Sequence, residues 1–135
     1  MRIGNAAWGL RETPLEKQLQ ITHEMGLDLL ELSIANYDKD ALQLDATDEQ
    51  IAAVRALYDK YGVSPECGCS GNDFTNDDVA DQVVRMKKVI EIAAKAGIRK
   101  LRIFSGFNSD SIVYGERKEK MLEALREIAV SSKTE

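Results

Sequence analysis

Apolar residues at helical spacing alternate with short apolar runs along the chain, and three of the helical stretches close at a glycine. Gly26, Gly62 and Gly97 follow these stretches and stand 36 and 35 residues apart. Glycine is favoured just past a helix because the left-handed conformation found there is strained for other residues. The period therefore predicts a repeated unit of one strand and one helix.

Four strands and four helices are predicted from this pattern. Thr13 with Glu16, and Thr47 with Gln50, have the spacing of a capping box at a helix start. The remaining helices are expected to begin near Asp77 and near residue 116. The strands are expected at residues 2–8, 27–34, 63–70 and 101–105.

Alternating strands and helices are typical of a parallel sheet with right-handed crossovers, so the expected fold class is α/β with four consecutive βα units. Residues 1–130 are expected to form one domain and residues 131–135 a frayed tail. Ligands bind at the carboxyl ends of parallel strands. The strand-to-helix loops at that end are the longer ones, and they begin near Trp8 and lie within residues 33–45, 70–73 and 105–111.

Two sheet architectures fit four such units: an open doubly wound sheet, or half of a (βα)8 TIM barrel. Strands of a doubly wound sheet are covered by helices on both faces and are apolar throughout. Glu31 and Arg102 stand in the middle of two predicted strands, which favours the barrel. In a barrel these alternate strands contribute to one interior layer, where the two charges can pair with Glu66 nearby. Such a pair can equally be structural, with no part in catalysis.

Composition narrows the possible partners and compartment. The 135 residues carry a net charge of −5, which argues against a nucleic acid or an anionic membrane surface as partner. No apolar run long enough for a membrane span and no signal-like N-terminus is seen. Cys67 and Cys69 are expected to be buried, reduced thiols, which indicates a cytoplasmic protein. The single histidine, His23, is expected on a helix surface away from any site.

Two segments resemble the xylose isomerase-like family of TIM barrels, the sugar phosphate isomerases and epimerases. Residues 26–32 (GLDLLEL) resemble the second strand of that family, and residues 93–106 (AAKAGIRKLRIFSG) resemble its fourth βα unit. The resemblance covers nearly the whole chain but only the N-terminal half of a family barrel.

The resemblance implies a site for a small sugar or sugar phosphate. It assigns tentative catalytic roles to two glutamates, and Asp73 and Asp110 are further candidate acids. It implies a divalent metal, Mn or Mg, bound by strands five to eight, so no metal ligand or cofactor is assigned to this chain. The residues assigned are, for catalysis, Glu31 and Glu66, and, for substrate binding, Trp8, Ser70, Arg102, Phe104 and Ser105.

Other functions stay open. A four-unit sheet has two open edges, which pair readily with other strands, so the chain is expected to form a homo-oligomer. It is then either the substrate-binding half of an isomerase, or a non-catalytic module or truncated fragment that self-associates into a barrel. A phosphate-binding domain is disfavoured because no G-x-G-x-x-G loop follows a strand.

Overall fold

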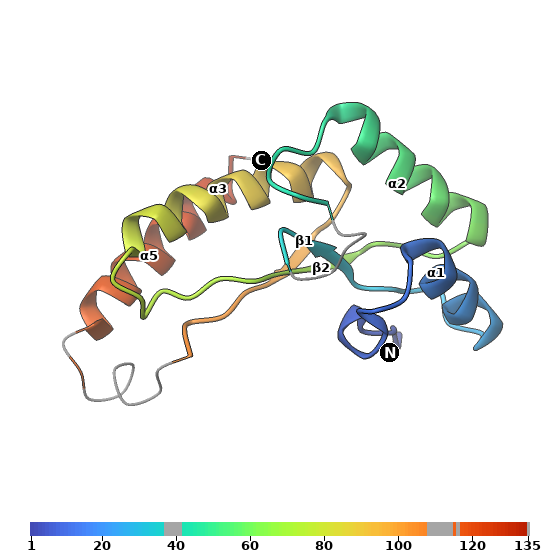
Figure 1. Ribbon diagram of the computed structural model, residues 1–135, viewed down its shortest axis with the longest axis horizontal. Helices are drawn as coiled ribbons and strands as arrows, with labels where there is room; N and C mark the ends of the chain where they lie inside the picture. The colour runs from blue at the N-terminus through green and yellow to red at the C-terminus, as the bar shows by residue number, and fades with distance from the viewer. Residues whose placement is uncertain (37–41, 108–114, 116, 135) are drawn as a thin grey trace.

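The structure, a computed structural model, describes residues 1–36, 42–107, 115 and 117–134 (Figure 1). Helices alternate with parallel strands, which confirms the α/β class. In chain order the elements are η1 (Ala7–Leu10), α1 (Leu15–Glu24), β1 (Leu32–Ile34), α2 (Asp48–Tyr61), β2 (Cys67–Ser70), α3 (Val79–Lys95), β3 (Lys100–Arg102) and α5 (Arg117–Ser131).

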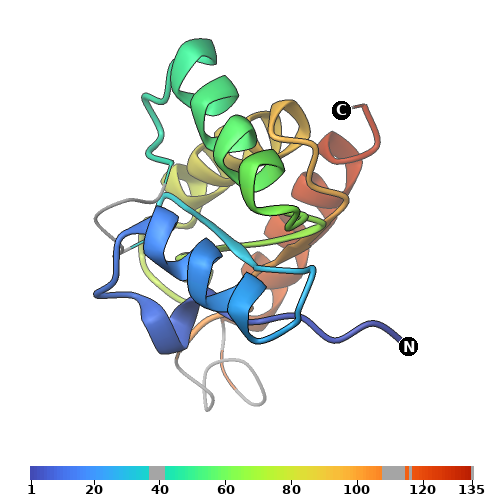
Figure 2. The same cartoon turned by 90° about the vertical axis from the view of Figure 1, so that its right-hand side faces the viewer.

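The three strands lie in the order β1-β2-β3, all parallel. Strands that follow one another in sequence order, with right-handed crossovers, place every connecting helix on the same face of the sheet. The helices form an arc from α1 through α2 and α3 to α5 around the strands (Figure 2), and each helix packs on the next. This is the arrangement of half a TIM barrel, and it excludes the doubly wound sheet.

The first predicted strand is reduced to one bridge. Asn5 forms a parallel bridge opposite Leu30: its N–H donates to the Leu29 carbonyl, and its carbonyl accepts from the Glu31 N–H. The chain then turns into a 3₁₀ helix at Ala7–Leu10 instead of continuing the strand. The prediction of a strand over residues 2–8 is therefore wrong in extent. A segment at the edge of a sheet pairs with a strand on one side only, so few backbone hydrogen bonds keep it in the sheet. The other strands are also shorter than predicted.

The two predicted capping boxes differ in outcome. At α2 the Thr47 hydroxyl accepts from Gln50 N–H and the Gln50 side chain accepts from Thr47 N–H, as predicted. At α1 the box is absent: Pro14 is the N-cap residue and no side chain caps the helix. The reason is that the Glu16 carboxylate accepts hydrogen bonds from Lys60 and Tyr61 on α2 instead of turning back to its own helix.

The core lies between the sheet and the helices. Leu30, Leu32 and Ile34 are at most 1% exposed, which confirms that this alternating set faces the helices. The Tyr58 hydroxyl on α2 donates to the Leu30 carbonyl and ties that helix to the strand. Gly26, Gly62 and Gly97 all have positive φ at the helix ends, as predicted. In the described residues, no helix combines the length and the apolar character needed to cross a membrane.

Candidate functional site

The open inner face of the sheet carries an ion pair between alternate strands. Arg102 at the end of β3 donates from Nε to Glu31 Oε1 at 3.0 Å and from Nη2 to Glu31 Oε2 at 3.4 Å. The Glu31 side chain is only 10% exposed and that of Arg102 is 41% exposed. This hydrogen bond raises the pKa of Arg102. The structure therefore confirms the predicted pairing of these two charges across β2.

Two cysteines on β2 lie beneath this ion pair. Cys69 stands in register between Ser33 of β1 and Arg102 of β3. Burial raises the pKa of Cys69 to about 11, and the nearby Glu31 carboxylate adds to the shift. The pKa of Cys67 is raised by burial and by the same carboxylate. Both cysteines are free, and because the pKa of each is raised, the two thiols are protonated at neutral pH.

Aromatic side chains stand above the ion pair at the carboxyl ends of the strands. The Arg102 guanidinium lies 5.1 Å from the centre of the Phe104 ring, and the Phe104 and Phe107 ring centres are 5.1 Å apart. Trp8 on η1 is 60% exposed, with Arg11 stacked 4.7 Å from its ring centre. These rings offer flat apolar surfaces next to a charged pair.

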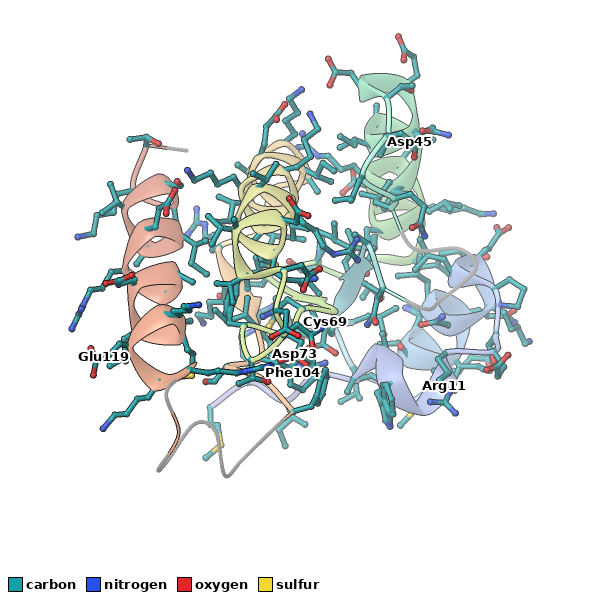
Figure 3. The ribbon with its side chains drawn as sticks, turned by 60° about the vertical axis from the view of Figure 1, so that its left-hand side comes forward. Arg11, Asp45, Cys69, Asp73, Phe104 and Glu119 are labelled. Carbon is teal, nitrogen blue, oxygen red and sulfur yellow. The ribbon has the colours of Figure 1, made fainter. Side chains whose placement is uncertain are left out.

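The loop after β2 holds the loop after β3. The Asn72 side chain donates to the Phe104 carbonyl at 2.5 Å and accepts from Phe104 N–H at 3.0 Å. Asp73 Oδ1 accepts from Phe107 N–H at 3.3 Å and from Thr75. Figure 3 shows Asp73 and Phe104 next to each other, near Cys69. These bonds position the aromatic side chains.

Gly106 is required in this contact. A Cβ atom there would lie 2.4 Å from Thr75 Cγ2 and 2.8 Å from Asp73 Oδ1, both well inside contact distance. Burial of Asp73 opposes its ionisation, but the hydrogen bonds from Thr75 and Phe107 outweigh burial and lower the pKa of Asp73. The two loops are thus joined by an ionised carboxylate beside a glycine.

A cavity of about 1040 Å³ joins the ion pair, the aromatic rings and the loops. This is the size of a pocket for a small organic ligand. Its described lining includes an apolar part and a polar part. The apolar part is Ala6, Trp8, Phe104 and Phe107, and the polar part is Glu31, Asn36, Asn72, Asp73, Asn76, Gln82, Arg85 and Arg102.

The structure brings four of the predicted site residues together and places three elsewhere. Trp8, Glu31, Arg102 and Phe104 line the cavity, whereas Glu66, Ser70 and Ser105 do not. Glu66 precedes β2 at the opposite end of the strands and pairs with Arg2 at 2.9 Å and Lys100 at 3.3 Å, so it does not join Glu31. Ser70 is fully buried and Ser105 is exposed. Asp110 lies outside the described residues.

Sequence reasoning did not single out the remaining lining residues, which are Ala6, Asn36, Gly71, Asn72, Asn76, Gln82, Arg85 and Phe107. Asn72 and Phe107 lie in the loops at the carboxyl ends of the strands, where the sequence predicted a site, but their contacts could not be predicted. Arg85 lies on α3, three residues after Gln82, and both line the cavity. The spacing of Gln82 and Arg85, which places two polar side chains on one side of α3 beside its apolar stripe, was the sequence signal that could have indicated them. His23 is exposed on α1, as expected.

The described residues do not fit a metal site. No group of three or more His, Cys, Asp or Glu side chains in the described part of the chain is placed to hold a metal ion. The lining carboxylates are already engaged, Glu31 by Arg102 and Asp73 by Thr75 and Phe107.

Three solved structures illustrate the folds to which this chain is similar. A candidate xylose isomerase from Rhodospirillum rubrum aligns with a TM-score of 0.75 at 15% identity, over 99% of this chain and 51% of that one. The 3-keto-D-glucoside 4-epimerase of E. coli aligns with a TM-score of 0.64 at 15% identity, over 98% and 53%. A xylose isomerase domain protein from Planctomyces limnophilus aligns with a TM-score of 0.58 at 18% identity, over 84% and 45%.

These alignments show the fold, and the chain spans about half the length of the structures it matches. No significant match is found among curated protein sequences. The sequence profile of one family, however, matches residues 19–135, which is most of the chain. The chain therefore belongs to the xylose isomerase-like TIM barrel family.

Proposed function

We propose that this chain forms the sugar-binding wall of an isomerase- or epimerase-type site. The observation that carries the proposal is the cavity in which exposed aromatic rings stand beside the Glu31–Arg102 ion pair at the carboxyl ends of the strands. Sugars present apolar C–H faces and polar hydroxyl edges, and this lining offers a partner for each. The three structurally similar proteins described above are named for xylose isomerase or a sugar epimerase, which supports the same class of ligand.

In this proposal Trp8 and Phe104 pack on the sugar ring, and Glu31 and Arg102 meet its hydroxyl groups. The family chemistry moves a proton between carbons next to a carbonyl, which requires a positioned general base. Of the two lining carboxylates, Asp73 is bound by Thr75 and Phe107, so Glu31 is assigned this role, and Arg102 holds it in place through two hydrogen bonds. Glu66, paired with Arg2 and Lys100, stabilises the other end of the sheet.

The single tryptophan provides the test. Trp8 lines the cavity and is the only indole in the chain, so its fluorescence reports on this site alone. Titration with the ketoses D-fructose and D-xylulose is expected to give a saturable change in emission. Phe104→Ala and Arg102→Gln are each expected to weaken binding about tenfold, the loss of one stacking or charge-assisted contact.

Ser105→Ala is the matched control, because Ser105 belongs to the same loop but does not line the cavity. It is expected to bind as the unaltered protein does. Absence of any saturable change with either ketose would refute the proposal. Equal weakening by Ser105→Ala would show that the loop as a whole, and not the cavity, determines binding.

A second candidate function is a non-catalytic module that pairs with a second copy. β3 is the last strand of the described sheet, and an apolar groove of about 620 Å³ runs beside it between α3 and α5, lined by residues that include Ile90, Leu101 and Leu125. A two-fold axis along the strands would pair β3 with the N-terminal strand segment of a second copy in parallel. Light scattering at micromolar concentration is expected to show a dimer, and a monomer alone would contradict it.

A further inference from the structure

Arg85 extends from α3 to the point where two strands end. Its Nε donates to the Gly71 carbonyl after β2 at 3.3 Å, and its Nη2 donates to the Ala35 carbonyl after β1. A guanidinium has five N–H groups, so three remain for a ligand. The residue is partly buried and lines the same cavity as the Glu31–Arg102 pair.

Arg85 differs from the other cation of the cavity in its charge balance. Arg102 is neutralised by Glu31, and the second lining carboxylate, Asp73, accepts from Thr75 and Phe107. Within the described residues, Arg85 forms no ion pair, and its two side-chain hydrogen bonds go to the Gly71 and Ala35 carbonyl oxygens. A partly buried cation without a counter-charge favours an anion in the adjoining cavity.

The backbone is strained at Ala35, one of the two residues whose carbonyl binds Arg85. Ala35 is only 2% exposed and has a φ of +49°, a left-handed conformation that is strained for any residue with a Cβ. It is the carbonyl of this strained residue that accepts from Arg85. Strain of this kind persists where the surrounding structure enforces it, and it concentrates at ligand sites.

We propose that Arg85 binds an anionic group, a phosphate or a carboxylate, at the end of the sugar that the cavity holds. This inference rests on the proposed sugar-binding function of the same cavity. The planar guanidinium, fixed by two carbonyls, presents its remaining N–H groups in the fork geometry that matches such oxygens. The sugar ring then lies between this anchor and the aromatic rings.

Paired ligands test the proposal. Affinities for D-fructose 6-phosphate, D-glucuronate and D-fructose are measured by Trp8 fluorescence, and inorganic phosphate is followed by NMR of the arginine Nε–H groups. The unaltered protein is expected to prefer an anionic sugar over fructose by about tenfold, the range of a charge-assisted hydrogen bond. Arg85→Gln is expected to abolish that preference while fructose affinity changes less than about twofold. The phosphorylated and carboxylated sugars show which anion is selected.

Arg99→Gln is the matched control, because it removes the same charge from an exposed residue outside the cavity. Equal affinity for charged and neutral sugars would overturn the proposal, as would an equal loss of both in Arg85→Gln, or the same effect in Arg99→Gln. If no sugar binds, the proposed function fails by itself. Inorganic phosphate then decides the role of Arg85: a saturable shift of its Nε–H supports it, and no shift refutes it.

Discussion

At the scale of single residues, the site depends on side chains that serve the backbone of another loop. Asn72 is 4% exposed and its amide takes both backbone hydrogen bonds of Phe104, as a neighbouring strand would. It thereby continues the pairing of β2 and β3 beyond the point where the ladder ends. The position of an aromatic ring in the cavity thus follows from an amide 32 residues earlier in the chain.

Asn72→Ala is expected to lower the free energy of unfolding by about 2 kcal/mol, because the N–H and carbonyl groups of Phe104 lose their partners. Urea denaturation measures the change. Asn76→Ala is the control: Asn76 lines the same cavity but is exposed, and its replacement should cost less than about 0.5 kcal/mol. A loss as small for Asn72 as for Asn76 would show that the amide does not position the loop.

Cys69 predicts a loss of stability at alkaline pH. Its pKa is about 11 in the folded chain, against an ordinary thiol value of 9.0. Between these values the folded protein keeps a proton that the unfolded chain has released, so stability falls as pH rises through this range. The loss contributed by this thiol is expected to be about 2 kcal/mol at pH 11. Below pH 8 it should contribute no pH dependence.

The measurement is the free energy of unfolding in urea from pH 8 to pH 11. Cys69→Ala should flatten the decline by that amount, whatever its effect at pH 8. Tyr58 adds a decline of the same sign at higher pH, because burial raises its pKa as well, and this part should persist in the variant. An identical pH profile in the two proteins would disprove the assignment to Cys69.

At the scale of elements, α1 and α2 begin with similar capping signals in the sequence but are capped differently in the structure. Thr47 and Gln50 form the expected reciprocal bonds at the start of α2. At α1, Glu16 is drawn to Lys60 and Tyr61 of the neighbouring helix. A capping box is a local pattern, but a contact between helices can take one of its two side chains.

The same substitution at the two threonines separates these cases. Thr47→Ala is expected to destabilise the protein by about 1 kcal/mol, the usual value of an N-cap side chain. Thr13→Ala should change stability by less than about 0.3 kcal/mol, because its side chain caps nothing. Thermal and urea unfolding report both values. Equal costs at the two positions would contradict the observed difference in capping.

At the scale of the whole molecule, the Glu31–Arg102 pair joins residues 71 positions apart and passes over β2. Glu31 directly precedes β1 and Arg102 ends β3, so the pair links these two strands across β2 and stabilises the curved sheet on its inner face. The described α-helices lie along the outer face. The inner face thus combines structural and candidate ligand-binding roles in the same side chains.

A double-mutant cycle with Glu31→Gln and Arg102→Gln is expected to give a coupling energy of about 1 kcal/mol, reduced from a fully buried value because Arg102 is 41% exposed. The surface pair Lys87–Glu127, with both side chains about half exposed, is the control and should couple by less than about 0.5 kcal/mol. Urea unfolding in low salt measures both. No greater coupling at Glu31–Arg102 would mean that the pair does not hold the strands together.

Much of the fold was predictable because its signals are local. The glycine period, the alternation of Leu30, Leu32 and Ile34 with Glu31, and the Thr47 cap each depend on a few neighbouring residues, and all are confirmed. The site was predictable in part. Glu31 and Arg102 were matched because strand alternation and barrel layering constrain which charges face inward.

The rest was decided by tertiary contacts. Arg85 lines the cavity because α3 places it at the carboxyl ends of the strands. Glu66 lies outside the cavity because it precedes β2 at the opposite end of the sheet, where it pairs with Arg2 and Lys100. The sequence by itself determined which residues form helices and which faces are apolar, since propensity and periodicity act over one or two turns. Apart from the Glu31–Arg102 pair, only the tertiary structure decided which polar side chains from distant parts of the sequence meet, because hydrogen bonds join whichever groups the packed chain brings within about 3 Å.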